Sequence, residues 1–486
     1  MPPDDTVDDD AVDDHTSHDL PFLEDALPAD AITTSDDVRD AHATDWGTDE
    51  GTTPDAVVWP ETTEEVSAVL AGATKHGIPV TPYAAGTSLE GNPVPAHGGI
   101  SMDLTRMDSV LEVRPEDHQL DVEPGVMGPA IEEAAGEHGL FFPPLPSSGD
   151  ISTIGGMIAN SASGMQTVKY GEIADWVLEL EAVLADGSVI TAGSRAVKTS
   201  SGYNLRDLLI GSEGTLAVVT SATLELAGRP EQIRGGRALF PTLDDATAAV
   251  TDAVQSGVDV AKIELIDAES ARMANAYTGA DLPDEPMVFV ELHADHGIEE
   301  EIAFCESIFE AHGVERFEIA DDDRMDDLWR ARKDLAFAVR SYDPDLEPLH
   351  PGDVTVPISE YGPLIQYAKE RAAEEDLLVP CFGHAGDGNV HYSILVDPDD
   401  PDEVERGEAL YSEIVQWAID VGGTATGEHG IALGKREFLV AEHGEVTVEA
   451  MRAIKRALDP TDTLNPGKIF PETAEGERVR ADVPEE

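Results

Sequence analysis

Three loops of glycine and small polar residues, all in one strand-rich part of the chain, most constrain its fold. They cover residues 84–91, 147–164 and 211–216. Ordinary turn chemistry explains any one of them about as well as ligand binding does. Small side chains also let backbone approach a large planar ligand closely, and consecutive N–H groups in a concave turn suit a pyrophosphate. Three such loops together therefore predict a buried cofactor.

The order of elements argues against a nicotinamide or ATP site. We expect a strand at 56–59, a helix that begins with the capping box Thr62-x-x-Glu65, and a second strand at 78–81. The glycine loop follows the second strand of this βαβ unit, whereas a Rossmann unit places its G-x-G-x-x-G after the first. Residues 430–435 contain a glycine and a lysine without the spacing of a phosphate-binding Walker loop. NAD and ATP are therefore poor candidates.

The length of 486 residues exceeds one hydrophobic core and indicates two or three domains. Short strands and turns dominate as far as residue 230, and helices then alternate with strands, as in an α+β domain. We predict five segments: an acidic, partly disordered extension (1–53, with 4–14 disordered), a cofactor domain (54–230), a substrate or cap domain (231–425), a C-terminal segment returning to the cofactor domain (426–472), and a disordered tail (473–486).

The charge is extreme, with 99 acidic and 30 basic side chains and a formal net charge of −69. Acidic runs such as 299–301, 321–323 and 399–403 lie far from the ends, whereas an acidic interaction protein would concentrate its charge in one tail. Repulsion of this size is tolerable where salt screens it, so we expect a halophilic, cytoplasmic protein. Nucleic acid is an unsuitable partner because there is no basic stripe.

Targeting and redox features are few. The sequence contains neither an apolar run of about 20 residues that could span a membrane nor the basic N-terminal region of a secretory signal. Two cysteines, Cys305 and Cys381, cannot form a disulfide framework or an iron–sulfur cluster. We expect a cytoplasmic protein that reaches the inner face of a membrane only through an electron acceptor.

A histidine pair provides the second candidate site. Glycines at 383, 386 and 388 would let the loop fold back and place His384 beside His391, which lies on an alternating strand. Two imidazoles suit a divalent metal if a third ligand joins them, and Glu428, beside His429, is the candidate. Two histidines at this spacing are still somewhat more often structural, and Glu428 is equally compatible with a solvated carboxylate.

A cluster of cations at residues 330–333 provides the third candidate site. Arg332 could bind an acidic substrate through the planar fork of its guanidinium, and Arg340 could face the same way. The alternative is ion pairing on a helix surface with Asp326 and Asp327.

Taken in order, these motifs resemble the FAD-dependent 2-hydroxy-acid dehydrogenases of the vanillyl-alcohol-oxidase-like fold, a family that includes D-lactate dehydrogenases and glycolate oxidase flavin subunits. The resemblance runs from Val57 to Phe470, and the last half looks most like the D-lactate dehydrogenases. Its motifs are residues 85–91, 155–164, 169–171, 202–205, 211–216, 383–391, 427–430 and 458–468.

The resemblance implies an α+β fold with a PCMH-type FAD-binding domain of two subdomains and an α+β cap. It implies FAD, bound non-covalently because Thr87 and Ser88 stand where some relatives attach it to a histidine. It further implies a divalent metal, zinc or manganese, on His384, His391 and Glu428, a catalytic base at His429 and a carboxylate-binding Arg332. The implied cofactor-binding residues are Ala84, Ala85, Gly86, Thr87, Ser88, Ser152, Gly155, Gly156, Ala159, Ser163, Gly164, Glu213 and Asn465.

The implied activity is oxidation of a small D-2-hydroxy acid, D-lactate to pyruvate first, with hydride transfer to flavin N5. Electrons would then pass to an external quinone, cytochrome or electron-transfer protein, and an oligomer is compatible with this. Two positions depart from the family pattern. Residues 83–85 read Tyr-Ala-Ala instead of Arg-Gly-Gly, and residues 349–352 lack the lysine of hydroxyglutarate-specific relatives, which favours a monocarboxylate.

Three alternatives stay open. One is a glycolate oxidase flavin subunit. Another is a non-catalytic scaffold subunit with the FAD fold, which should have lost the metal residues and the Glu428–His429 pair. The last is a plain metal-binding protein, which the cofactor loops disfavour.

Overall fold

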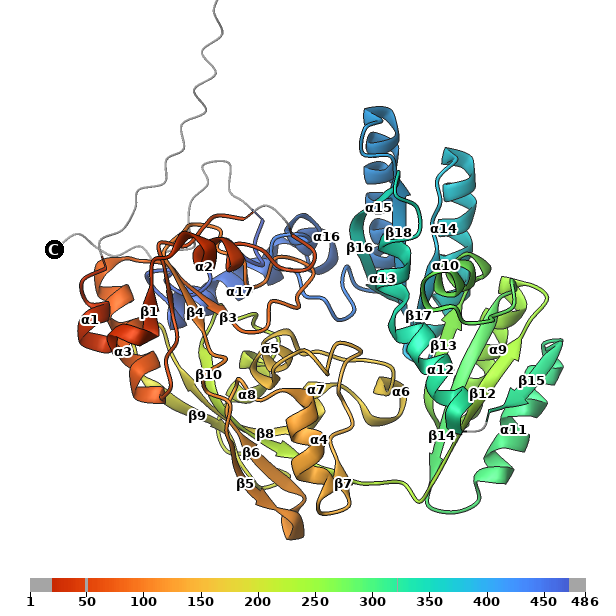
Figure 1. Ribbon diagram of the computed structural model, residues 1–486, viewed down its shortest axis with the longest axis horizontal. Coiled ribbons are helices and arrows are strands. Elements are labelled where there is room, and N and C mark those ends of the chain that lie inside the picture. Colours follow the sequence, from red (N-terminus) through yellow and green to blue (C-terminus); the bar gives the residue numbers. More distant parts are fainter. Residues whose placement is uncertain (1–19, 49–50, 321, 472–486) are drawn as a thin grey trace, which may run out of the picture.

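The computed structural model describes residues 20–48, 51–320 and 322–471 (Figure 1). The disorder expected at 4–14 and in the tail 473–486 lies outside these residues. Figure 1 shows two bodies side by side, with the C-terminal segment in blue returning from the second body to the first.

The first sheet has the order β1-β2-β4-β3, from Ile32–Thr33, Ala56–Val58, Ile100–Asp103 and Val80–Tyr83. β2, β4 and β3 run parallel. Half of the expected capping box is present: Thr62 accepts a hydrogen bond from the Glu65 N–H at the start of α3 (Thr63–His76), while the Glu65 carboxylate accepts the Glu61 N–H in place of the Thr62 N–H. Gly77 ends the helix in the left-handed region. Helices α1 (Leu23–Ala26) and α2 (Asp36–Ala41) precede β2, and Leu23 and Leu27 are buried in the core of this sheet.

The second sheet is antiparallel, with the order β5-β6-β10-β8-β9. Its strands are Val110–Arg114, Gln119–Val122, Val218–Glu225, Val177–Val183 and Val189–Gly193. Around it lie α4 (Gly128–Gly136), α5 (Ile154–Asn160), α6 (Thr167–Tyr170), α7 (Ile173–Trp176) and α8 (Leu205–Leu209), and the short strands β7 (Leu140–Phe141) and β11 (Ala227–Gly228) pair nearby. The first glycine loop follows β3, the second contains α5, and the third leads into β10.

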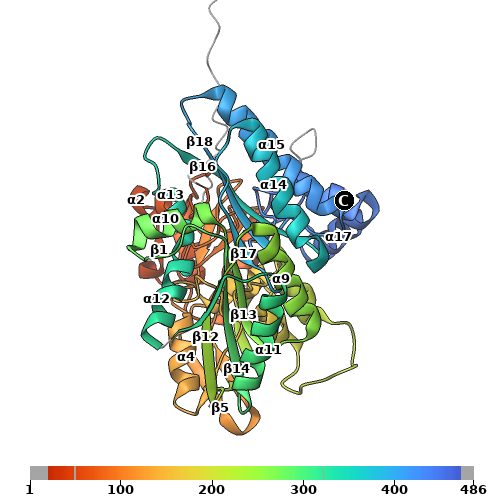
Figure 2. The ribbon, with the colours of Figure 1, turned by 90° about the vertical axis from the view of Figure 1, so that its right-hand side faces the viewer.

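The second body, which we call the cap, is built on a seven-stranded antiparallel sheet of order β15-β12-β14-β13-β17-β18-β16. Its strands are Arg316–Ile319, Gln232–Leu239, Met287–Ala294, Val260–Ile266, Cys381–His384, Asn389–Val396 and Glu347–Thr355. An apolar core joins one face to α9 (Leu243–Ser256), α11 (Ile298–Ala311), α14 (Tyr361–Glu375) and α15 (Pro401–Asp420) (Figure 2). The other face carries α10 (Ala268–Thr278), α12 (Asp322–Lys333) and α13 (Leu335–Arg340).

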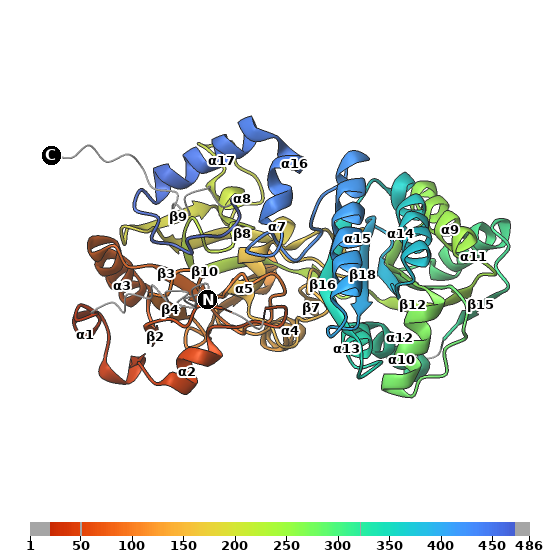
Figure 3. The same cartoon turned by 90° about the horizontal axis from the view of Figure 1, so that it is seen from above.

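The C-terminal segment, with α16 (Leu439–His443) and α17 (Glu445–Leu458), packs on the first body (Figure 3). The buried Lys455 ammonium donates to the carbonyls of Thr215 and Leu464 at 2.9 and 2.7 Å and pairs with Asp459 at 2.6 Å. The Asn465 N–H donates to the Val80 carbonyl, which attaches the segment to the edge of the first sheet. Residues after the cap therefore complete the first body.

Candidate functional site

A cavity of about 1750 Å³ lies between the glycine loops of the first body and the polar face of the cap sheet. It collects residues that are far apart in the sequence, as the motif order predicts. Among the predicted cofactor residues it is lined by Ala84, Ala85, Gly86, Thr87, Ser88, Ser152, Gly155, Gly156, Ala159, Ser163 and Glu213. From the cap and C-terminal segment it is lined by Arg332, His384, His391, Glu428 and His429.

Close packing and backbone conformation require two of the glycines in the loops on the cofactor side. Gly155 lies so close to Pro124 that an added Cβ would stand 2.6 Å from the proline Cβ. Gly86 has φ +66°, which a side chain disfavours. The Thr87 and Ser152 hydroxyls lie 3.0 Å apart and line the same wall. A large cavity with small-residue walls fits a flavin nucleotide.

Two predicted cofactor residues, Gly164 and Asn465, do not line the cavity. A third, Glu213, lines it but accepts hydrogen bonds from the C-terminal segment. Gly164 packs closely against Pro146, and Asn465 donates to the carbonyls of Asn92 and Glu213. The Glu213 carboxylate accepts the N–H groups of Ile431 and Ala432 at 2.9 and 3.0 Å. The structure therefore shows Glu213 and Asn465 attaching the C-terminal segment, and their contact with FAD remains a prediction.

Strand register sets the cap side of the cavity. Glu264 of β13 lies opposite His384 of β17, and His391 of β18 lies opposite both Phe382 and Asp353. Residues directly opposite on neighbouring strands share a face, so these side chains all point the same way. The hairpin between β17 and β18 places the two imidazole centroids 5.1 Å apart, as the glycine spacing predicts.

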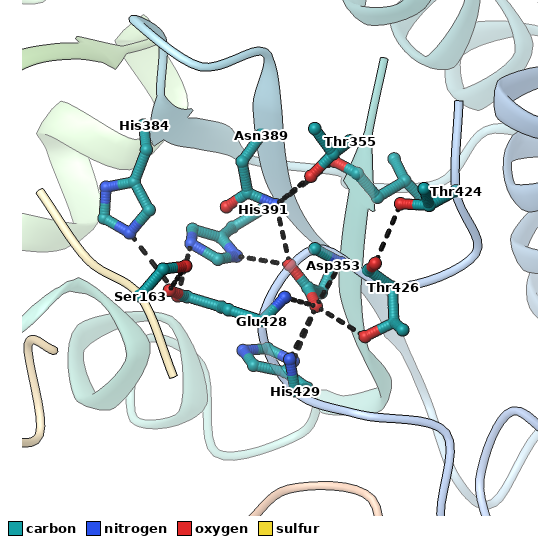
Figure 4. A network of polar contacts seen from close by, with 12 residues as sticks. Ser163, Asp353, Thr355, His384, Asn389, His391, Thr424, Thr426, Glu428 and His429 are labelled. Carbon is teal, nitrogen blue, oxygen red and sulfur yellow. Dashed lines mark hydrogen bonds and ion pairs between the residues drawn. The ribbon is translucent and has the colours of Figure 1, made fainter. Parts of the chain in front are cut away.

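Glu428 reaches this face from the C-terminal segment (Figure 4). Its Oε1 lies 3.4 Å from His384 Nε2 and 3.3 Å from His391 Nε2, and Ser163 donates to its Oε2 at 3.1 Å. Burial disfavours its ionised form, but the two imidazoles hold the pKa of Glu428 below its usual range. One carboxylate and two imidazole nitrogens thus converge on a single point.

A second grouping, of Asp353, His391 and His429, is also compact, but Asp353 has no free oxygen to offer. Its Oδ2 accepts the N–H groups of Gly427, Glu428 and His429 and the Thr426 hydroxyl at 2.9–3.0 Å. Its Oδ1 accepts the Asn389 amide at 2.7 Å. Asp353 therefore shapes the loop that carries Glu428 and His429, and the His384–His391–Glu428 group is the better metal site.

The environment of His384 fits a divalent cation. Its Nδ1 lies 2.8 Å from the Glu264 carboxylate, which leaves Nε2 as a ligand, the arrangement that metal-binding histidines favour. Burial raises the pKa of the neighbouring Asp387 to about 7, with Glu264 and Glu428 adding repulsion. Although burial disfavours a charge on His384, Glu264 and Glu428 raise its pKa well above the usual value. The group therefore attracts positive charge, which a divalent cation would supply.

His429, whose side chain is 14% exposed, is held as a neutral base. Burial first, and then the charges of Lys435 and His391, lower its pKa to about 4. Its Nδ1 has no hydrogen-bond partner within the described chain, and the nearest carboxylate oxygens, of Asp353 and Glu90, lie 3.7 and 3.8 Å away. A neutral imidazole at the cavity wall can accept a proton.

Arg332 lines the cavity and is only 4% exposed, so the helix-surface alternative is wrong for this residue. Its guanidinium pairs with Glu264 at 2.7 Å and lies over the Phe382 ring at 5.0 Å. The alternative does describe Arg330, which is exposed and pairs with Asp327. Arg340 lines the cavity mouth and donates to the Trp46 carbonyl at 3.3 Å.

Sequence reasoning missed four residues that organise the site: Glu90, Glu264, Asp353 and Lys435. Lys435 is fully buried, donates to the Asp353 carbonyl and lies 3.3 Å from Glu90. Charged residues alternate with apolar ones over residues 260–266, and that pattern could have revealed a strand with one polar face. For Asp353, no local signal exists, because its partners lie about 75 residues later in the chain.

Both parts of the chain match known protein families. Residues 54–193 match the FAD binding domain family and residues 229–469 match the C-terminal domain of FAD linked oxidases. A probable mitochondrial D-lactate dehydrogenase of Danio rerio is 37% identical over 89% of this chain and 88% of its own. The glycolate oxidase subunit GlcD of Bacillus subtilis is 35% identical over 87% of this chain and 90% of its own.

Solved structures with the same fold are more distant. The 4-ethylphenol oxidase of Gulosibacter chungangensis superposes with a TM-score of 0.75 at 19% identity, covering 93% of this chain and 97% of its own. An alkyldihydroxyacetonephosphate synthase gives 0.73 at 19% identity, covering 92% and 84%. These likenesses confirm the predicted vanillyl-alcohol-oxidase-like α+β fold. Within the described ranges, no helix is long and apolar enough to cross a membrane.

Proposed function

The chain belongs to the FAD-linked 2-hydroxy-acid oxidoreductases, the family of D-lactate dehydrogenases and GlcD subunits, and we propose that it oxidises D-lactate to pyruvate. The observation that carries the proposal is the meeting of Arg332, the His384–His391–Glu428 group and His429 in one cavity with the cofactor loops. A scaffold subunit would not need these side chains together.

The loops at 84–88 and 155–156 would hold FAD, and His384, His391 and Glu428 would hold a divalent cation, zinc or manganese. When bound, FAD supplies an acceptor for the hydride from the substrate C2, and the cation supplies a Lewis acid at the 2-hydroxyl. FAD would be non-covalent, because the first loop contains no histidine.

The chain's own residues supply orientation and a proton acceptor. Arg332 binds the substrate carboxylate through guanidinium nitrogens that Glu264 does not occupy. His429, neutral because its pKa is lowered to about 4, accepts the hydroxyl proton.

Substrate size follows from charge. The stretch at 349–352, which lines the cavity, contains no lysine or arginine for a second carboxylate. A small monocarboxylate such as D-lactate therefore suits the site better than a dicarboxylate. Glycolate is the second candidate, since GlcD subunits are about as similar to this chain as the D-lactate dehydrogenases.

The surroundings of the enzyme are also part of the proposal. The charge of −69 suits a cytoplasm of high salt. Electrons from the flavin would pass to an external quinone, cytochrome or electron-transfer protein, and the enzyme would reach the inner face of the membrane only through that acceptor.

The test is anaerobic bleaching of the flavin in high salt by D-lactate, L-lactate, glycolate and D-2-hydroxyglutarate. We expect D-lactate to reduce the flavin fastest. Faster reduction by glycolate would support the second candidate, and reduction by L-lactate alone would overturn the proposal.

A further inference from the structure

We propose that Glu264 is a positioning residue that couples the metal group to the substrate-binding arginine. The inference rests on the proposed function, because it assigns a shared support to two of its elements. Glu264 is fully buried and contacts both His384 and Arg332.

The register of the cap sheet fixes the first contact. Glu264 of β13 lies directly opposite His384 of β17, so its Oε1 meets the imidazole Nδ1 at 2.8 Å. Accepting a hydrogen bond from Nδ1 selects the tautomer whose Nε2 lone pair faces Glu428 and His391. Only that tautomer can bind a metal at Nε2.

The second contact uses the other oxygen of the same carboxylate. Glu264 Oε2 lies 2.7 Å from Arg332 Nη2, and Phe382 packs on the guanidinium plane. Arg332 Nε has no hydrogen-bond partner among the residues that the structure describes. Glu264 therefore holds the guanidinium in place while leaving nitrogen atoms for a substrate carboxylate.

A carboxylate is needed because both partners are donors. A glutamine has the same shape but only one acceptor oxygen. If its oxygen faces His384, its NH₂ group opposes Arg332. If the glutamine amide is flipped, its NH₂ group donates to His384 Nδ1. The imidazole proton must then lie on Nε2, and this tautomer cannot bind a metal at Nε2. Glu264→Gln must therefore weaken either metal binding or substrate binding, and Glu264→Ala must weaken both.

The same sheet face contains a matched control. Glu291 of β14 is also buried and also contacts two nitrogen partners, the Lys262 ammonium and the His293 imidazole, each at 2.9 Å. It lies one strand away from Glu264 and outside the cavity lining. Glu291→Gln thus removes a buried, paired carboxylate of the same kind without touching His384 or Arg332.

The experiment uses the full FAD-loaded protein in high salt. After chelator treatment, Zn²⁺ and Mn²⁺ affinities are measured by competition with a chromophoric chelator, and KM and kcat for D-lactate are measured on metal-reconstituted protein. Flavin content and circular dichroism report folding. We expect Glu264→Gln to raise the metal dissociation constant or KM at least tenfold, Glu264→Ala to raise both, and Glu291→Gln to change each less than threefold.

Two outcomes would overturn the inference: both quantities within threefold of wild type in folded Glu264→Gln, or equal losses in Glu291→Gln. Failure of the proposed function looks different, because the wild-type protein would then show no flavin reduction by any hydroxy acid. The metal affinities of the variants still test the Glu264–His384 contact in that case.

Discussion

Replacing Asp353 with asparagine should disorganise the loop at residues 426–429, which carries Glu428 and His429. Asp353 itself lies in none of the sequence motifs that indicated the site. One carboxylate oxygen accepts the N–H groups of Gly427, Glu428 and His429 and the hydroxyl of Thr426, and these four bonds fix the loop. Burial disfavours the ionised form of Asp353, but the charge of Lys435 and the hydrogen bond from the Glu428 N–H keep its pKa well below the usual range, so the carboxylate is ionised.

The size of the effect follows from those four bonds. A hydrogen bond to a charged group contributes about 1.5–3 kcal/mol and a neutral one about 1 kcal/mol. Neutralising the acceptor therefore costs about 1 kcal/mol for each bond, or about 4 kcal/mol of folding free energy. Because Glu428 and His429 are carried by the same loop, we also expect flavin reduction by D-lactate to slow at least 100-fold in the molecules that remain folded.

The assay pairs denaturant unfolding with anaerobic stopped-flow reduction, and Asp267→Asn is the control. Asp267 is a buried cap carboxylate that accepts the N–H groups of Ser270 and Cys381 at 2.7 and 2.8 Å, away from the cavity. Its variant should lose stability but keep its reduction rate within about twofold. A normal reduction rate in folded Asp353→Asn would refute the reasoning.

Three further predictions concern single residues. Glu428→Gln should keep its FAD but bind Zn²⁺ or Mn²⁺ at least tenfold more weakly, as metal analysis will show, because an amide is a poorer ligand. Arg332→Lys should lower kcat/KM for D-lactate about 100-fold, mainly through KM, because an ammonium lacks the bidentate fork. Burial raises the pKa of the Glu90 carboxyl from 4.5 to about 7 in the folded protein. The neutral carboxyl therefore contributes its full stability below pH 4.5, and this stability is lost as the pH rises through 7. Between pH 5 and pH 8 wild type should therefore lose up to about 3 kcal/mol of unfolding free energy relative to Glu90→Gln, and parallel curves would contradict this.

Local signals in the sequence predicted the elements that they control. Thr62 and Gly77 bound α3 as expected, because a cap depends only on residues within one turn. The β17–β18 hairpin also follows from nearby glycines, which is why the pairing of His384 with His391 could be predicted. The glycine loops alone predicted a buried cofactor, and the resemblance of the whole series of motifs to a known family indicated the fold.

Partners set by long-range register could not be predicted in this way. Glu264 meets His384 only because β13 pairs with β17, strands separated by more than 100 residues. Arg332 could be read either as a substrate ligand or as a surface ion pair, and only the packing of α12 on the sheet buries it. Glu213 shows the opposite case: its motif indicated a cofactor contact, while its oxygens are occupied by the N–H groups of Ile431 and Ala432.

The most direct test of the account is single-turnover reduction of the flavin in wild type and His429→Ala. Both proteins should carry FAD and bind Zn²⁺ or Mn²⁺ equally, because the His429 ring only stacks on His391, at 5.6 Å between centroids, and its loss removes no member of the His384–His391–Glu428 group. We predict that D-lactate bleaches the wild-type flavin and that the variant is slowed at least 1000-fold. Bleaching of His429→Ala at the wild-type rate would contradict the assignment of the proton acceptor and, with it, the proposed chemistry of the cavity.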